Sequence, residues 1–390
     1  MYQIAIVFLT FVCVFGGITV AKSLDNLDED FIRVPLVSFH SPSRSRREVN
    51  VNGKKVEFWN DRNIHYAINI TVGTPPQPFI MDFDTGSNDL WIPSINGNCP
   101  YLCKAINKYD PSASSTYKAI TNNPDFHIGY ETGGVSGTRA TETVSFNGFT
   151  IKDQIIGVGT VQTVDSYNYP FDGTIGWGWS GANSATDPNS TIMENLQKQG
   201  SIQKRLSCVK LHQDSEQPGG ELLIGGCDGR VAGNGLWQIP IDKVEAIGTD
   251  GKSRASICEP GNKITNCQVV LDSGAAPIGG PTYLLDPIAS KLGATKYDEN
   301  LKDYVVDCDD KTLGNVEFTF GKFKVVMTPG DYLSKNGDKC VLNMQRLDNL
   351  QILLLGDPFL RKVTLILDQD NDRAGLAKSN IDKPVKRPTA

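Results

Sequence analysis

The chain has 390 residues, of which 39% are hydrophobic, and its formal net charge at pH 7 is −6. This length and apolar content allow more than one domain-sized core, and the negative charge argues against a nucleic-acid partner, which would need a basic face. The 38 glycines and 21 prolines interrupt many short apolar runs, and helical periodicity is scarce. The composition therefore predicts an all-β protein.

The chain begins with an apolar run over residues 4–18, followed by small residues up to Ala21. This run is too short for a comfortable membrane span and no comparable run follows it. We therefore predict a secretory signal peptide at residues 1–21 and no membrane span. Because secretion and lysosomal delivery start with the same signal, we expect a secreted protein and keep the lysosome as an alternative.

A polar segment follows the predicted signal peptide and ends in a cluster of arginines at residues 44–47. A processing protease could cut at this cluster, which predicts a short pro-segment at residues 22–47. The alternative interpretation of the cluster is a solvated, flexible segment.

The next feature is an apolar strand, predicted at residues 79–83, that runs into Asp84-Thr85-Gly86-Ser87. These four residues favour a tight turn. A carboxylate at the end of a buried strand is costly, and such placements are common where chemistry is done. Taken alone, the motif has two other interpretations. It is an ordinary turn, or Asp82 and Asp84 point the same way along the strand and bind a metal ion, as in a carbohydrate enzyme.

The same pattern recurs in the second half of the chain, where an apolar strand at residues 267–271 ends in Asp272-Ser273-Gly274. The recurrence indicates an internal duplication of one supersecondary unit. Two equivalent loops related by a pseudo-twofold axis would bring Asp84 and Asp272 together. Two carboxyl groups at hydrogen-bonding distance share one proton, so that one serves as an acid and the other as a base.

With these two loops and several further segments, the chain resembles the pepsin family of aspartic proteases over residues 64–378. The further segments are Trp91, the flap-like stretch 128–137, and residues 171–176, 354–361, 368 and 375–377. The resemblance implies an all-β, bilobal pepsin-like fold, with two β-barrel lobes related by a pseudo-twofold axis and a cleft between them. The expected lobes are residues 48–236 and 237–380, followed by a disordered tail at residues 381–390.

The resemblance also implies an activity, in which Asp84 and Asp272 activate a water molecule that hydrolyses peptide bonds of extended polypeptides. It implies no cofactor, no metal, inhibition by pepstatin-like compounds and a monomeric protein. The supporting residues that it implies are Thr85, Gly86, Ser87, Ser273 and Gly274 around the carboxylates, and Tyr130, Thr132, Trp91 and Ile175 in the flap and substrate-binding region.

Three positions depart from the family pattern. Ala275 is the symmetry mate of Ser87 and cannot donate a hydrogen bond to Asp272, whereas one such bond to a carboxylate is worth about 1.5–3 kcal/mol. Its absence predicts a raised second pKa for the pair. Active members of the family that carry alanine at this position tend to work nearer neutral pH. Ala276 replaces a hydroxyl residue and Glu131 replaces a flap glycine. The alanines favour a rival hypothesis, a catalytically weak or inactive homologue that binds peptides or proteins in the cleft.

Of the nine cysteines, Cys13 belongs to the predicted signal peptide, and the even number that remains suggests disulfides. The resemblance implies the pairs Cys99–Cys103, Cys258–Cys267 and Cys308–Cys340, which leaves Cys208 to pair with Cys227. A zinc site is the alternative for Cys99 and Cys103, although neither a histidine nor a second cysteine pair lies near them. Asn69 and Asn189 begin glycosylation sequons.

Overall fold

The computed structural model describes the greater part of the chain between residues 32 and 378. The described ranges are 32–40, 47–51, 54–58, 64–98, 107–130, 133–162, 171–179, 191–212, 219–227, 238–258, 267–310, 313–336 and 338–378. Several predictions fall outside the described residues, namely the signal peptide at 1–21, the tail at 381–390, Cys99, Cys103, Glu131, Thr132 and Asn189.

The largest sheet has thirteen strands drawn from both halves of the chain. They are β1 (Ile32–His40), β4 (Ile64–Val72), β5 (Gln77–Asp84), β6 (Leu90–Asn98), β7 (Lys118–Ala119), β8 (Asp125–Tyr130), β9 (Gly133–Phe146), β10 (Phe149–Gln162), β11 (Gly173–Gly176), β12 (Leu206–Leu211), β13 (Gly220–Ile224), β27 (Val363–Asp368) and β28 (Arg373–Lys378). Their order is β28-β27-β12-β13-β1-β4-β5-β11-β6-β10-β9-β7, with β8 paired to β9. The last two strands of the chain thus join the sheet of its first half.

The remaining sheets lie mainly in the second half. One contains β14 (Gln238–Pro240), β17 (Gln268–Leu271), β26 (Leu353–Leu355), β18 (Ile278–Gly280) and β25 (Met344–Arg346). A second contains β16 (Ser253–Ile257), β15 (Lys243–Ile247), β21 (Asn315–Phe320) and β22 (Phe323–Met327), and a third contains β19 (Lys296–Asp298), β20 (Asp303–Val306), β24 (Lys339–Val341) and β23 (Ser334–Asn336). The strands β2 (Arg47–Val51) and β3 (Lys54–Phe58) form a separate hairpin.

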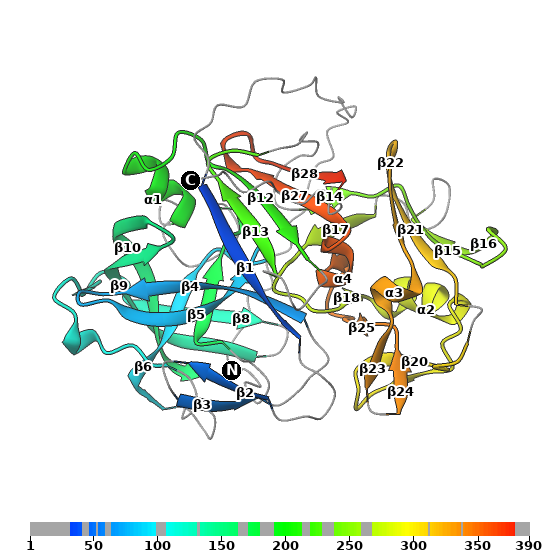
Figure 1. Cartoon of the computed structure of the whole chain (residues 1–390), viewed down its shortest axis with the longest axis horizontal. Helices are drawn as coiled ribbons and strands as arrows, with labels where there is room; N and C mark the ends of the chain where they lie inside the picture. Colours follow the sequence, from blue (N-terminus) through cyan, green and yellow to red (C-terminus); the bar gives the residue numbers. More distant parts are fainter. Residues whose placement is uncertain are drawn as a thin grey trace, which may run out of the picture.

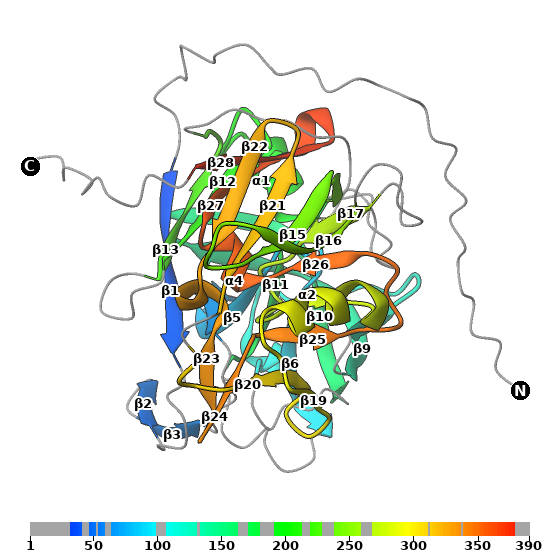
Figure 2. The ribbon, with the colours of Figure 1, turned by 90° about the vertical axis from the view of Figure 1, so that its right-hand side faces the viewer.

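The helices are short. They are α1 (Ile192–Lys198), α2 (Thr282–Lys291), α3 (Pro329–Tyr332) and α4 (Asp357–Leu360), with 3-10 turns at Pro111–Ala113 and Gln369–Asn371. Figure 1 shows two lobes, one built mostly from the first half of the chain and the other from the elements between β15 and β25. In Figure 2 the molecule is turned so that the second lobe faces the viewer. The expected all-β, bilobal fold is confirmed. Among the described residues, no helix has the length and apolar character needed to cross a membrane.

The two aspartate strands lie in sheets of the same topology. In the first half, β5 pairs antiparallel with β4 and parallel with β11, and β11 pairs antiparallel with β6, which pairs parallel with β10. In the second half, β17, β14, β26, β18 and β25 repeat these pairings in the same order and directions. This repetition is what an internal duplication predicts.

The strand β5 is buried on both faces where it approaches Asp84. Met81 and Phe83 are completely buried, and Asp82, which points to the other side of the strand, is 2% exposed. Strands that are covered on both faces read as continuous apolar runs rather than alternating ones. This explains why residues 79–83 appear apolar throughout except at Asp82.

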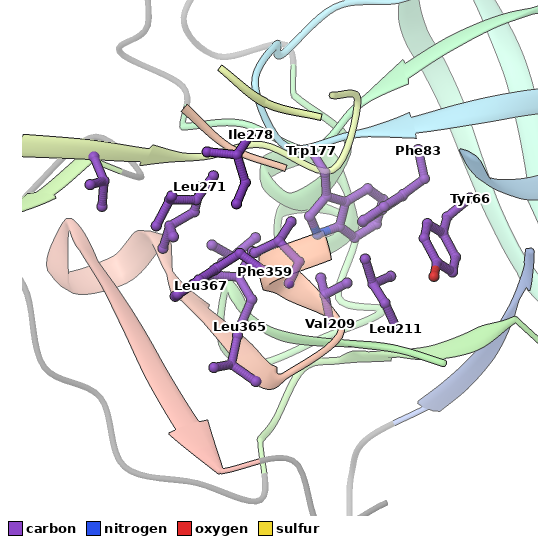
Figure 3. Packing of buried hydrophobic residues seen from close by; sticks show 14 of the residues in the cluster. Tyr66, Phe83, Trp177, Val209, Leu211, Leu271, Ile278, Phe359, Leu365 and Leu367 are labelled. Atoms are coloured by element: carbon purple, nitrogen blue, oxygen red, sulfur yellow. The ribbon is translucent and has the colours of Figure 1, made fainter. Parts of the chain in front are cut away.

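One apolar core connects the two halves of the chain. Figure 3 shows Phe83 and Trp177 of the first half in the same buried cluster as Phe359 of α4 and Leu365 and Leu367 of β27. The ring centroids of Phe83 and Trp177 are 5.3 Å apart. Because interiors are packed at close to crystalline density, this shared core fixes the two aspartate strands relative to each other.

The strand β1 lies in the middle of the largest sheet, although it falls within the predicted pro-segment. Its first part, Ile32 to Leu36, pairs with β13, and its second part, Val37 to His40, pairs with β4. The low apolar periodicity of this region gave no indication of a strand. Its backbone hydrogen bonds with two neighbours supply the stabilisation that its sequence pattern does not reveal.

Candidate active site

The two Asp-Thr/Ser-Gly loops are joined by four reciprocal hydrogen bonds. Thr85 N donates to Ser273 Oγ at 3.1 Å and Thr85 Oγ1 donates to Leu271 O at 2.9 Å. In the mirrored pair, Ser273 N donates to Thr85 Oγ1 at 3.0 Å and Ser273 Oγ donates to Phe83 O at 2.7 Å. Both hydroxyl side chains are almost completely buried. The serine at position 273 therefore supplies the same bonds as a threonine would.

This junction brings the side chains of Asp84 and Asp272 into contact, with a hydrogen bond between their carboxyl groups. Gly86 N donates to Asp84 Oδ1 at 2.7 Å, and Gly274 N donates to Asp272 Oδ1 at 2.9 Å. The Ser87 hydroxyl also donates to Asp84 Oδ2. A Cβ atom on Gly86 would lie 2.7 Å from the Asp272 carboxyl, and one on Gly274 would lie 2.6 Å from Asp84 Oδ1. Only glycine leaves room for the carboxyl groups at these two positions.

The surroundings of the two carboxyl groups differ. The pKa of Asp272 is raised well above its usual value, first by its removal from water and then by the charge and hydrogen bond of Asp84, with a smaller contribution from Asp82. Gly274 N acts in the opposite direction. Asp84 receives an additional hydroxyl bond from Ser87, whereas the symmetric position holds Ala275. These surroundings therefore favour a proton on Asp272.

The hairpin of β8 and β9 carries Tyr130 at its end. Trp91 Nε1 donates a hydrogen bond to the Tyr130 hydroxyl at 2.8 Å. Tyr130 and Trp91 pack with Phe126 and Val135 in a small cluster that is separate from the main core. Burial and the nearby charge of Asp84 raise the pKa of Tyr130. Tyr130 and Trp91 are thus in contact, and Tyr130 lies near Asp84.

Ile175, the other predicted substrate-binding residue that the structure describes, is placed differently. Ile175 is fully buried in the main core, paired with Phe83 and Leu90 across its neighbouring strands, so its side chain faces packed protein. Thr174, which sequence reasoning did not single out, makes a side-chain hydrogen bond to Tyr130. The one signal that could have identified Thr174 is its position next to Gly173 in the segment that resembles the end of the first lobe.

The remaining predictions concern metal binding, disulfides and glycosylation. Within the described ranges, no three side chains of His, Cys, Asp or Glu are grouped so that they could hold a metal ion. Asn69 lies exposed on β4. The structure contains three of the expected disulfides, Cys208–Cys227, Cys258–Cys267 and Cys308–Cys340.

Comparisons with known proteins agree with this geometry. A family model described as eukaryotic aspartyl protease matches residues 65–379. Pepsin A of Canis lupus familiaris is 30% identical over 336 residues, which cover 82% of this chain and 82% of the relative. Cathepsin D of Gallus gallus is 32% identical over 343 residues, with 82% of each chain covered. Pepsin A of Sus scrofa is 30% identical over 399 residues, which cover 91% of this chain and 97% of the relative. Since the family model spans both aspartate loops and most of the chain, the protein belongs to the eukaryotic aspartyl protease family and has its all-β, bilobal, pepsin-like fold.

Proposed function

We propose that the protein is an aspartic endopeptidase that hydrolyses peptide bonds of extended polypeptides with a water molecule activated between Asp84 and Asp272. The observation that carries the proposal is the contact between the two carboxyl groups, held by the reciprocal bonds of Thr85 and Ser273. Two carboxyl groups at this separation cannot both ionise cheaply, so they share one proton.

In the proposed mechanism, Asp84 is the base and Asp272 is the acid. The ionised Asp84 takes a proton from water as the water oxygen attacks the peptide carbonyl carbon, and Asp272 gives its proton to the carbonyl oxygen. The resulting diol then collapses. Asp84 returns its proton to the leaving nitrogen, the C–N bond breaks, and one diol hydroxyl returns a proton to Asp272. One water is consumed and both carboxyl groups regain their starting states.

The assignment of the base follows from the hydrogen bonds that each carboxylate receives. Asp84 accepts bonds from Gly86 N and from the Ser87 hydroxyl, which favour its ionised form. Asp272 accepts a backbone bond from Gly274 N, and its removal from water favours its protonated form. We propose that Tyr130 covers the bound substrate, whose extended backbone would be held mainly by main-chain hydrogen bonds.

The second candidate function is a homologue that binds peptides or proteins in the cleft without cleaving them. It is favoured by Ala275 and Ala276, which remove two hydroxyl groups from the second aspartate loop. The complete set of loop hydrogen bonds supports the enzyme more strongly, because these bonds position both carboxylates regardless of the two alanines.

The experiment that separates the two candidates is hydrolysis of denatured haemoglobin over about pH 3–7, the range that a shared-proton carboxyl pair can serve. It compares the wild-type protein with Asp84→Asn, Asp272→Asn and the control Asp309→Asn, an exposed aspartate in the second half of the chain. We expect pepstatin-sensitive cleavage by the wild type and the control and none by the two site variants. Pepstatin binding without cleavage by the wild type would favour the peptide-binding homologue.

We also propose a processing and export route. The three disulfides fit an oxidising compartment, and so we expect secretion, with lysosomal delivery as the alternative. Removal of the pro-segment by a cut near Arg47 would break the covalent link between β1 and the rest of the chain, while the backbone of β1 pairs with β13 and β4. The exposed Asn69 is the described candidate for glycosylation, which a mass shift after glycosidase treatment would test.

A further inference from the structure

Two further carboxyl groups are buried behind the catalytic pair. Asp82 precedes Asp84 by two residues on β5, so the two side chains emerge on the same side of the strand. Asp357 begins α4, and its backbone N–H donates to Ala275 O at 2.9 Å, which ties α4 to the second aspartate loop. Asp82 is 2% exposed and Asp357 is 1% exposed.

The positive charge near these carboxyl groups comes from Arg361, which is 6% exposed. Its Nη2 donates to the carbonyl oxygen of Asp331 at 3.2 Å. Neither carboxyl oxygen of Asp357 has a hydrogen-bond partner among the described residues. Burial raises the pKa of Asp357 well above its usual range, opposed by Arg361 and reinforced by the charges of Asp82 and Asp272.

The charged and titratable groups around Asp82 and Asp357 come from several elements and together form one buried cluster. The phenol of Tyr66 on β4 lies near both Asp357 and Arg361. The acidic groups are Asp84 on β5, Asp272 after β17, Asp82 and Asp357, whereas Arg361 is the cation. Carboxyl groups outnumber the cation, and an uncompensated buried carboxylate is expensive, so the cluster retains protons. Since neither carboxyl oxygen of Asp357 accepts a hydrogen bond from the described residues, Asp357 is the natural holder of one of these protons.

We propose that Asp82 is a positioning residue that acts through Asp272: its negative charge, buried behind the catalytic pair, keeps the shared proton in place at less acidic pH. This inference rests on the proposed function and extends it to the pH range of the reaction. The equivalent position in the second loop, two residues before Asp272, holds Val270, so the second half of the chain offers no matching charge. The chain therefore carries this carboxylate on one side only.

The lack of a side-chain hydroxyl at Ala275 and the negative charge of Asp82 affect the shared proton of the catalytic pair in the same direction. Each disfavours loss of the shared proton, the first because the ionised form of Asp272 lacks a donor and the second because a like charge opposes ionisation. We expect the two changes together to move the alkaline limit of the reaction toward neutral pH.

The test compares Asp82→Asn and Asp82→Val with the wild type in the pH profile of kcat/KM. We expect the alkaline midpoint to move to lower pH by about half to one unit, a three- to tenfold loss of activity above that midpoint. The control is Asp172→Asn, which alters a buried aspartate immediately before β11 whose Oδ2 accepts a bond from Ile80 N at 2.7 Å. An unchanged midpoint in both Asp82 variants would overturn the proposal, as would an equal shift in the Asp172 control.

A second measurement does not depend on activity. Burial raises the pKa of Asp272 and of Asp357 in the folded protein above the pKa in the unfolded chain. The contribution of these two groups to stability is therefore complete below their unfolded-state pKa and is lost as the pH rises through their folded-state pKa. Asp82→Asn lowers both folded values, so we expect its Tm to rise relative to that of the wild type between about pH 4 and 7. Parallel Tm curves would refute the charge coupling. If the wild type cleaves nothing while the curves diverge, the proposed function fails and the coupling stands.

Discussion

Substitution of Gly86 by alanine should damage the reaction through a single contact. The added Cβ would lie 2.7 Å from the Cγ, Oδ1 and Oδ2 atoms of Asp272, whereas ordinary contacts begin at 3.4 Å. The carboxyl group must then move by about 0.7 Å or the loops must separate. The reciprocal bonds of Thr85 and Ser273 resist separation, so we expect the carboxyl group of Asp272 to be displaced. Displacements of about 1 Å can reduce rates by about 10²-fold, which corresponds to about 2.7 kcal/mol in the barrier.

The assay is kcat and KM on a peptide substrate, together with Tm, for Gly86→Ala and for Gly330→Ala as the control. A Cβ on Gly330 would meet only Thr328 Oγ1, at 3.7 Å, so this variant adds the same methyl group without a clash. We expect a fall in kcat of about 10²-fold for Gly86→Ala and little change for the control. Wild-type kcat in Gly86→Ala would refute the claim that close contact of the two carboxyl groups carries the reaction.

Two further substitutions give outcomes of defined sign. Ala275→Ser restores a donor for Asp272, so we expect the alkaline midpoint of the kcat/KM profile to fall by about one pH unit; a rise would contradict the assigned acid. Tyr130→Phe removes the acceptor for Trp91 Nε1, and we expect a higher KM and a loss of about 0.5–1.5 kcal/mol in transition-state binding, measured as kcat/KM. Unchanged kinetics in Tyr130→Phe would show that the hydroxyl has no role in substrate binding.

Much of the site could be predicted from the sequence because its residues recur in two short loops. A strand that ends in Asp, a hydroxyl residue and Gly has few physical reasons to appear twice in one chain, and the pairing of Thr85 with Ser273 follows once the loops are equivalent. The family pattern likewise implied the disulfides Cys258–Cys267 and Cys308–Cys340, and Cys208–Cys227 followed by elimination.

What the sequence did not reveal depends on contacts between distant segments. The strand β1 pairs with β13 and β4, which no local periodicity predicts, because strand formation depends on neighbours more than on intrinsic preference. Ile175 and Thr174 are adjacent, and only the register of β11 against β5 and β6 decides that one faces the core and the other the flap tyrosine. A one-residue error in reading that segment exchanges the two roles.

The scaffold of the two halves repeats, but the surroundings of the two carboxylates do not. Two carboxyl groups with identical surroundings would have no preference for which one keeps the proton, so acid and base would be exchangeable. In this chain Ser87 donates to Asp84, whereas Ala275 donates nothing from its side chain to Asp272. The hydrogen bonds between the two loops thus bring the carboxylates together symmetrically. Ser87 and Ala275 then make the surroundings of the two carboxylates different, which distinguishes the proposed base from the proposed acid. Ala275 is therefore compatible with the proposed activity, because it strengthens the preference for a proton on Asp272 without preventing the two carboxyl groups from sharing it.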